Sequence, residues 1–287
     1  MNLAAFEAFV KVMETGSISI AAELLFITQP AVTKRIHSLE DYFGVKLFES
    51  AGRGIQPTHA AHSLLPKVKT WLNELGEIHH TLSHEQTQVQ GRLKIGTSHH
   101  IGLHHLAEPL KKFVQLFPQV TLDVHFVDSE QAHEQVLAGE LELAFLTLPP
   151  AGDDRLSYVT IWNDPLVFVS APFHPLAKQT QLNLEDLIAY PSLLPAAQTY
   201  TSQITLSEFE KNGLKPKITM SNNPLESIRM LVSIGLGWSV LPKTFLNEDL
   251  KQLDLNLKMN RQLGMVWHPA RIQSRAAEEL IQLMKND

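Results

Sequence analysis

The 287-residue sequence contains no cysteine. Disulfide bonds, cysteine-based redox sensing and thiolate metal sites are therefore excluded. Charge is also modest, with 19% charged residues and a net charge of −6. This balance argues against a protein that coats nucleic acid with its whole surface, but it permits a small, locally aimed binding surface.

Long apolar runs are lacking as well. The longest apolar stretch, around residues 230–241, is shorter than the roughly 20 residues that span a bilayer. The N-terminus lacks the basic-then-apolar order of a secretory signal peptide. We therefore expect the protein to be cytoplasmic.

Residues 17–36 have the pattern of two short helices joined by a turn. Gly16 is expected to end a preceding helix at about residues 2–14, because glycine tolerates the left-handed conformation found after a helix. Ser17 and Thr28 are the predicted N-caps of the two following helices. The stretch therefore predicts a helix-turn-helix.

The last of these helices has an apolar face and a polar face. The apolar positions recur at helical spacing and are expected to face the core: Val32, Ile36 and Leu39. The side chains expected to point away are Gln29, Thr33, Lys34 and His37. Glutamine can bond adenine bidentately and threonine can contact base edges or phosphate, whereas Lys34 and Arg35 are expected to contact phosphates. This helix is the predicted DNA-reading helix.

A glycine-rich segment follows. Residues 44–48 and 52–58 are expected to form two short strands around a tip, which is a wing. Arg53 lies between two glycines at this tip, where it is placed to enter a minor groove or touch the DNA backbone. For the helix-turn-helix as a whole, a helical hairpin used only for protein contact is the alternative interpretation.

From Phe6 to Thr58 the sequence resembles the DNA-binding domain of LysR-type transcriptional regulators. The matching segments are Phe9-Val10, Gly16-Ser17, Ala21-Ala22-Glu23-Leu24, Gln29-Pro30-Ala31, Leu39-Glu40, Gly44-Val45-Lys46-Leu47-Phe48 and Gly52-Arg53-Gly54. The length and order of elements in the rest of the chain are also similar to this family. The resemblance implies DNA contacts from Ser17, Ser19, Thr28, Gln29, Pro30, Ala31, Thr33, Lys34, Arg35, His37, Arg53 and Thr58.

Residues 59–88 are expected to form a linker helix. Its apolar residues recur with heptad spacing: Ala61, Leu64, Val68, Trp71, Leu75, Ile78 and Leu82. Three heptads are marginal alone, so we expect pairing with a second copy and two reading heads on a pseudo-palindromic DNA site. An amphipathic helix lying on its own domain is the alternative. Residues 1–60 carry five basic and six acidic residues, so a single copy should bind DNA weakly.

From Leu93 onward strands and helices alternate, which predicts an α/β fold. The resemblance implies two α/β lobes of the periplasmic-binding-protein type, joined by two crossings. The predicted strands are 93–96, 120–127, 141–146, 165–170, 191–194, 217–220, 238–241 and 263–267, with a final helix at 272–284. The predicted organisation is a winged helix-turn-helix at 1–58, a linker helix and hinge at 59–90, and an effector domain at 91–287, with its first lobe at about 91–165 and 265–287 and its second at about 166–264.

Small ligands bind between the lobes of such folds. Hydroxyl-rich segments at predicted helix starts favour a carboxylate or another anion. The candidate effector-binding residues are Thr97, Ser98, His99, His100, Thr147, Thr199, Tyr200, Thr201, Ser221, Asn222 and Asn223. The resemblance implies that they lie in the cleft, and Thr147 is included on that ground alone. Simple helix caps are the alternative for each of them. No arginine falls in these segments, which favours a singly charged ligand.

Histidines cluster at the start of the first helix of this domain, as His99, His100, His104 and His105. His100 and His104 are one helical turn apart and could share a metal ion. No neighbouring carboxylate or cysteine completes the set, so no metal site is predicted. A milder hypothesis is that His99 or His100 touches the effector and makes the response depend on pH.

The sequence thus predicts a transcription regulator that binds specific double-stranded DNA as a homodimer or homotetramer and is switched by a small metabolite. RNA polymerase is a further candidate partner. No Gly-x-Ser-x-Gly, P-loop or His-Glu-x-x-His motif is present, so we expect no catalytic residues and no cofactor. The alternatives are a solute-binding protein for a transporter and a cytoplasmic small-molecule or metal-responsive protein acting mainly through protein partners.

Overall fold

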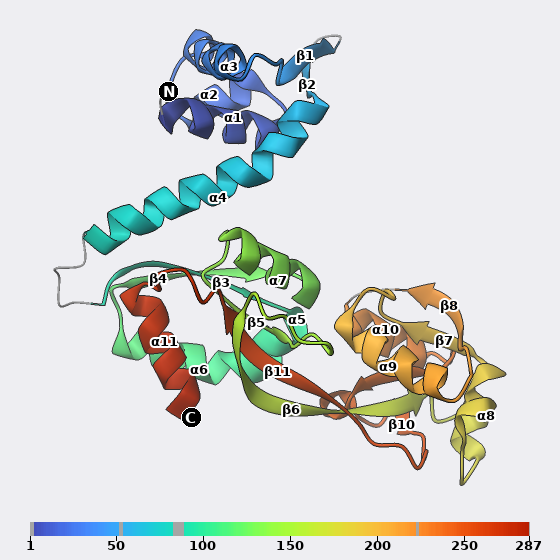
Figure 1. Cartoon of the computed structure of the whole chain (residues 1–287). Coiled ribbons are helices and arrows are strands. Elements are labelled where there is room, and N and C mark those ends of the chain that lie inside the picture. The colour runs from blue at the N-terminus through green and yellow to red at the C-terminus, as the bar shows by residue number, and fades with distance from the viewer. Residues whose placement is uncertain (1–2, 52–53, 83–88, 222–223, 287) are drawn as a thin grey trace. The chain divides into compact units, whose positions relative to one another are not determined.

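The computed structural model describes residues 3–51, 54–82, 89–221 and 224–286 (Figure 1). The chain divides into two compact units near residue 87. None of the helices in these ranges is long and apolar enough to cross a membrane.

The first unit is a winged helix-turn-helix followed by a long helix. Its elements are α1 (Leu3–Thr15), α2 (Ile18–Leu24), α3 (Gln29–Phe43), β1 (Phe48–Ala51), β2 (Gly54–Pro57) and α4 (His59–Leu82). Gly16 has φ +64° after α1, and the Ser17 hydroxyl accepts a hydrogen bond from Ile20 N at 3.4 Å, as expected of a helix stop and an N-cap. Thr28 occupies the N-cap position of α3, but its side chain makes no capping hydrogen bond.

The core of the first unit contains the apolar residues that helical spacing predicted. Val32, Ile36 and Leu39 of α3 are buried, and the small side chains of Ala21 and Ala22 let α2 lie against its neighbours. Strands β1 and β2 pair antiparallel and form the predicted wing.

Helix α4 forms where predicted, and part of its heptad seam faces its own unit. Ala61 and Val68 are buried in the core of their own unit, and the Trp71 ring lies 5.0 Å from the ring of Phe6. The first half of the seam therefore packs within the chain, as the alternative interpretation expected, because α1 already covers it. The described helix ends at Leu82; residues 83–88 lie outside the described residues.

The second unit begins with a lobe whose sheet carries helices on both faces (Figure 1). Its elements are β3 (Gly91–Thr97), α5 (His99–Ile101), the π-helical turn η1 (Gly102–Leu106), α6 (Ala107–Leu116), β4 (Val120–Phe126), α7 (Ser129–Ala138), β5 (Leu143–Thr147), β6 (Ser157–Ser170), β11 (Met259–Trp267) and α11 (Arg275–Asn286). Leu143 and Phe145 of β5 join the core under α6 and α11, whereas Ala144 and Leu146 join the core under α7. Burial of both faces explains the continuous apolar run of this strand.

The second lobe lies between β6 and β11 in sequence. Its elements are η2 (Pro175–Lys178), α8 (Leu184–Ile188), β7 (Pro191–Leu194), α9 (Tyr200–Lys211), β8 (Lys217–Ser221), α10 (Leu225–Ser233), β9 (Ser239–Pro242), η3 (Lys243–Phe245) and β10 (Lys251–Gln252). Trp238 is fully buried at its centre, stacks on Phe209 with ring centroids 5.6 Å apart, and donates its indole N–H to Leu187 O at 2.8 Å.

Two long antiparallel strands join the lobes, as the predicted crossings require. The seven-stranded sheet has the order β10-β6-β11-β5-β3-β4, and β9 also pairs with β6. The pairing of β6 with β11 runs from Ser157↔Trp267 to Leu166↔Met259, and it places Asp164 opposite Arg261. The paired strands β6 and β11 therefore run through both lobes.

Candidate functional site

The exposed face of α3 forms a broad open hollow of about 710 Å³. Its lining residues are Ile18, Gln29, Pro30, Thr33, Lys34, His37, Ser38 and Asp41. The predicted reading residues Gln29, Thr33, Lys34 and His37 thus lie on one surface, away from the core. This is the arrangement of a helix that presents its side chains to a groove.

Other predicted DNA contacts have structural partners in the unit. Arg35 Nη1 donates to Ala4 O at 3.4 Å, so its side chain reaches back to α1 and not outward as predicted for a phosphate contact. The Thr58 hydroxyl donates to Lys46 O at 2.8 Å and fastens the base of the wing. Ser17 caps α2. The predicted contacts that do not line the hollow also include Ser19, Thr28 and Ala31, and Arg53 lies outside the described residues.

Glu40 holds the wing to the end of α3. Its buried carboxylate accepts hydrogen bonds from Leu47 N at 2.8 Å, Phe48 N at 3.3 Å and Lys46 Nζ at 2.7 Å. Burial alone raises the pKa of Glu40, but these three donors outweigh it and lower the pKa below its ordinary value. The wing is therefore positioned by a charged group that does not face DNA.

A second candidate site is a cavity of about 70 Å³ between the two lobes of the effector unit. Lobe-one residues, lobe-two residues and one residue of β11 surround it: Ser98, His99, His100, Asp128, Ser129, Glu130, Thr147, Pro195, Thr199, Thr201, Pro224, Leu225, Glu226 and Arg261. A water needs roughly 10–15 Å³ on this measure. The cavity therefore has room for several waters or a very small ligand, and a larger ligand requires the lobes to open.

Six of the predicted effector residues line this cavity: Ser98, His99, His100, Thr147, Thr199 and Thr201. Ser98 and Thr199 are also helix caps, accepting hydrogen bonds from Ile101 N at 3.4 Å and Ser202 N at 3.3 Å. For Ser98 and Thr199 the cap interpretation is confirmed, and effector contact stays a prediction.

Three predicted residues do not line the cavity. Thr97 is fully buried, because strand alternation places it on the same face of β3 as Leu93 and Ile95. Tyr200 is committed to contacts with the other lobe, and Ser221 is exposed on β8. Asn222 and Asn223 lie outside the described residues.

Sequence reasoning missed five lining residues: Asp128, Ser129, Glu130, Pro195 and Arg261. Pro224, Leu225 and Glu226 also line the cavity and belong to the predicted helix start at Asn223. Asp128 to Glu130 lie just beyond the carboxyl end of β4, and the rule that ligands bind beyond the carboxyl ends of parallel strands could have found them. Arg261 carries no local signal, because only the long return of β11 brings it to the cavity.

Arg261 forms a buried ion pair at the point where the crossing strands meet the cavity. Its Nε and Nη2 lie 2.8 Å and 2.7 Å from Asp164 Oδ2, and its Nη1 donates to Thr201 Oγ1 at 3.0 Å. Burial alone raises the pKa of Asp164, but His100 and Arg261 together lower it, so the carboxylate is ionised. The arginine charge at the cavity is therefore largely balanced.

The other ionisable side chains that line the cavity are mainly carboxylates. Burial raises the pKa of Glu130, whose Oε1 accepts a hydrogen bond from Tyr200 N at 2.5 Å. Glu226 Oε1 is buried and has no hydrogen-bond partner in the described part of the chain. Together with Asp128, these groups disfavour a multiply negative ligand and favour one that donates hydrogen bonds.

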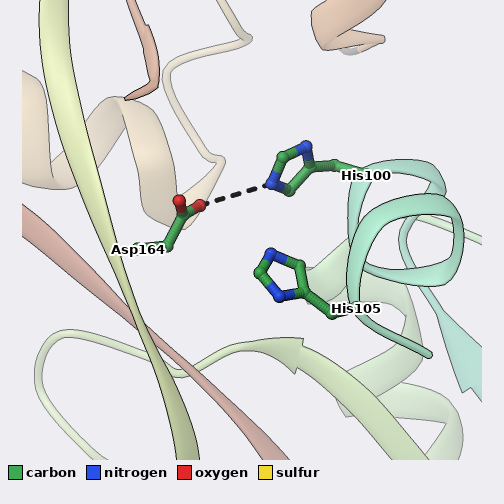
Figure 2. A group of neighbouring side chains, drawn as sticks. All are labelled: His100, His105 and Asp164. Atoms are coloured by element: carbon green, nitrogen blue, oxygen red, sulfur yellow. Dashed lines mark ion pairs between the residues drawn. The ribbon is translucent and has the colours of Figure 1, made fainter. Parts of the chain in front are cut away.

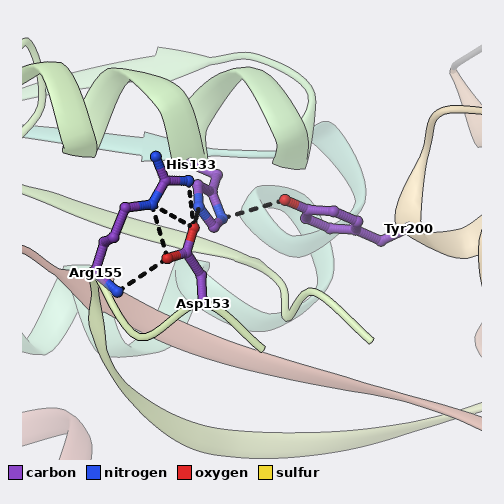
Figure 3. A network of polar contacts seen from close by, with 4 residues as sticks. All are labelled: His133, Asp153, Arg155 and Tyr200. Carbon is purple, nitrogen blue, oxygen red and sulfur yellow. Dashed lines mark hydrogen bonds and ion pairs between the residues drawn. The ribbon is translucent and has the colours of Figure 1, made fainter. Parts of the chain in front are cut away.

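A polar network joins the lobes beside the cavity (Figure 3). The hydroxyl of Tyr200, on α9, lies 3.2 Å from His133 Nδ1, on α7, and His133 Nε2 lies 2.8 Å from Asp153 Oδ2. Asp153 is in turn held by Arg155 Nη2 at 2.6 Å. Burial, reinforced by the charge of Glu130, raises the pKa of Tyr200 to about 12, so its hydroxyl remains a donor.

The two units match two parts of one known family. Residues 3–62 match the family described as bacterial regulatory helix-turn-helix protein, lysR family, and residues 86–287 match the LysR substrate binding domain. The chain therefore belongs to the LysR family of bacterial transcriptional regulators, with a DNA-binding domain and an effector-binding domain. It is a regulator and not an enzyme, as the sequence predicted.

Individual relatives agree with this assignment. The chain is 30% identical over 236 residues to the HTH-type transcriptional activator CmpR of Synechocystis sp., covering 82% of this chain and 77% of the relative. Full-length CbnR in complex with its target DNA shares the fold with a TM-score of 0.71 at 19% identity, covering 100% and 99% of the two chains. The effector-binding domain of QuiR in complex with shikimate aligns with a TM-score of 0.62 at 20% identity, covering 68% and 95%.

Proposed function

We propose that this regulator reads double-stranded promoter DNA with the exposed face of α3 and responds to a small metabolite held in the cavity between its lobes. The observation that carries the proposal is the polar cavity itself, walled by both lobes in a chain that also presents a free reading face. The solved complexes of CbnR with DNA and of QuiR with shikimate support the two roles by analogy of fold.

The reading unit works in pairs. Ala61 and Val68 are buried within the chain, so the surface left for a second copy begins near Trp71. Exposed apolar side chains of the same unit are Leu3, Tyr42, Phe43, Val45 and Trp71, and both Phe43 and Trp71 contact the ring of Phe6. Self-association would cover them and give two reading heads for a pseudo-palindromic site, as a homodimer or a homotetramer of two dimers. We place this assembly in the cytoplasm, where promoter DNA and RNA polymerase are.

The effector class follows from the charges of the cavity. Arg261 and Thr201 offer donors to a carboxylate or hydroxyl group, whereas Asp128, Glu130 and Glu226 offer acceptors to an ammonium or hydroxyl group. A small metabolite with both kinds of group, such as an amino acid or a polyhydroxy acid, satisfies both sides. Its binding favours one closure of the lobes, which alters the spacing of the paired reading heads by linkage.

The DNA-reading role predicts a specific loss in Gln29→Ala. The test uses DNA sites selected from a random pool by the wild-type protein. For Gln29→Ala, the ratio of affinity for these sites to affinity for non-specific DNA should fall by roughly 5- to 150-fold per lost contact, since a bidentate base contact contributes about 1–3 kcal/mol. Lys34→Ala is the matched control and should weaken binding to all sequences alike, with a shallower salt dependence. Unchanged selectivity in Gln29→Ala would show that another residue reads the site.

The sensing role is tested by thermal unfolding of the full chain against small carboxylates, polyhydroxy acids and amino acids. A compound present at 100 times its Kd should stabilise the folded protein by about 2.7 kcal/mol and raise its Tm. For a ligand with an ammonium group, Glu226→Gln should weaken binding roughly tenfold or more, because a charged hydrogen bond is lost. Glu210→Gln, at an exposed position of α9, is the control. If no compound raises the Tm, the cavity is not a sensor for these classes.

A further inference from the structure

The π-helical turn η1 brings His105 to the side of the turn on which His100 lies. In an α-helix residues four apart share a face, whereas a π-turn brings residues five apart together. His100 and His105 accordingly point to the same side, with ring centroids 5.5 Å apart (Figure 2). Such turns are rare and are found frequently at functional sites. The ring of His104 is also close to that of His100, at 4.9 Å, but among the described residues it is His105 that lies together with His100 and a carboxylate. The pair that could share an ion with a third ligand is therefore His100 and His105.

A carboxylate completes the set. Asp164, on β6, points between the two rings, and one potential ligand atom from each of the three residues lies within 4.8 Å of the others (Figure 2). The distance from His100 Nε2 to Asp164 Oδ2 is 3.4 Å. Two ligand atoms bound to one tetrahedral zinc at about 2.0–2.1 Å lie roughly 3.4 Å apart, so these two atoms already have the required separation.

The imidazole nitrogens make no contact that competes with such a role. His100 is 3% exposed, and in the described part of the chain the ion-pair contact of its Nε2 is with Asp164, the third member of the group. His105 Nε2 is buried and has no hydrogen-bond partner there. Unpaired buried polar groups are costly, and a bound ion would satisfy them.

We propose that His100, His105 and Asp164 form a binding site for a divalent transition-metal ion of the zinc class. Two imidazoles and a carboxylate suit zinc and cobalt, and three protein ligands leave a fourth position open to water. Arg261 orients Asp164 through hydrogen bonds to its Oδ2, as hydrogen-bonded partners of metal ligands commonly do. Its positive charge opposes the ion, so binding should be weaker than at a closed structural zinc site. The site does not depend on the proposed effector, although His100 also lines that cavity.

Cobalt titration of the untagged full-length protein tests the site. We expect one Co²⁺ per chain with the visible absorption of a tetrahedral centre, displaced by Zn²⁺, in the wild type and in His104→Asn. His104 is the matched control because it lies on the same turn and is outside the three-residue group. His105→Phe should bind at least tenfold more weakly, since even outer-shell changes cost about 10- to 100-fold.

His105→Phe is expected to fold normally. Its ring can keep the contact with Trp162, whose centroid lies 5.0 Å from that of His105, and its buried nitrogen makes no hydrogen bond to lose. An unchanged Tm without metal would confirm this, and His105→Gln provides a second variant with the same expected loss of cobalt. The proposal fails if the wild type gives no saturable tetrahedral spectrum, or if both His105 variants bind cobalt as the wild type does.

Discussion

At the scale of single residues, Glu40 shows how a charged side chain can shape a DNA-binding unit without touching DNA. Its carboxylate gathers two backbone N–H groups and the Lys46 ammonium at the start of the wing. Because a buried N–H left without an acceptor is costly, the pairing holds the wing in one position relative to α3. The sequence places Glu40 in a family segment, but only the structure shows its partners.

Glu40→Gln should lower the free energy of unfolding by about 1.5–3 kcal/mol at pH 7, because charged hydrogen bonds become neutral ones. The folded pKa of Glu40 lies below its ordinary value of 4.5. The extra stability of the ionised group is therefore complete above about pH 4.5 and is lost as the pH falls through the lower, folded pKa. Urea unfolding of both proteins between pH 3 and 7 measures this, with Glu49→Gln on the exposed face of the wing as control. A deficit of equal size at pH 3 and pH 7 would contradict the explanation.

At the scale of elements, the turn between α2 and α3 carries strain. Phe26 has φ 54° and is 94% exposed, so a bulky side chain occupies a left-handed conformation without packing against the core. Backbone hydrogen bonds from Phe26 N to Glu23 O and from Ile27 N to Ala22 O close the turn in this shape. The left-handed conformation costs a residue with a Cβ about 1–2 kcal/mol.

Phe26→Gly should therefore stabilise the unit by roughly 0.5–1 kcal/mol, after the larger entropy of glycine in the unfolded chain is subtracted. Ile20→Ala, at an exposed position of α2, should change stability by less than about 0.5 kcal/mol. Chemical denaturation of the three proteins makes the comparison. A less stable Phe26→Gly would mean that the exposed ring makes a stabilising contact in solution.

Elements with a periodic pattern were predictable, and those governed by distant partners were not. Strand β7 has the predicted bounds, 191–194, because a buried apolar run sits between turn residues. Strand β6 was predicted only from Pro165, although it begins at Ser157, because its first half is partly exposed and contains Asn163 and Asp164. The π-turn η1 had no recognisable signal, since its five residues also fit an α-helix.

At the scale of the whole molecule, the cavity was predictable in part. Ser98 and Thr199 were found because each follows a strand and begins a helix, which is a local pattern. Arg261 and Asp164 were not, because their role arises from the pairing of two strands almost a hundred residues apart in sequence. Local sequence patterns therefore identified the hydroxyl residues at helix starts, whereas the buried Asp164–Arg261 pair could be found only from the tertiary structure.

The order of strands in the shared sheet also sets an order of events during synthesis. Strand β11 lies between β6 and β5, yet the ribosome makes it only after the entire second lobe. The first lobe must therefore wait, with an open sheet edge along β5, until about residue 267 has emerged. A nascent chain stalled in the second lobe would present that edge to other chains, so the interval before β11 arrives is when this protein is most exposed to aggregation.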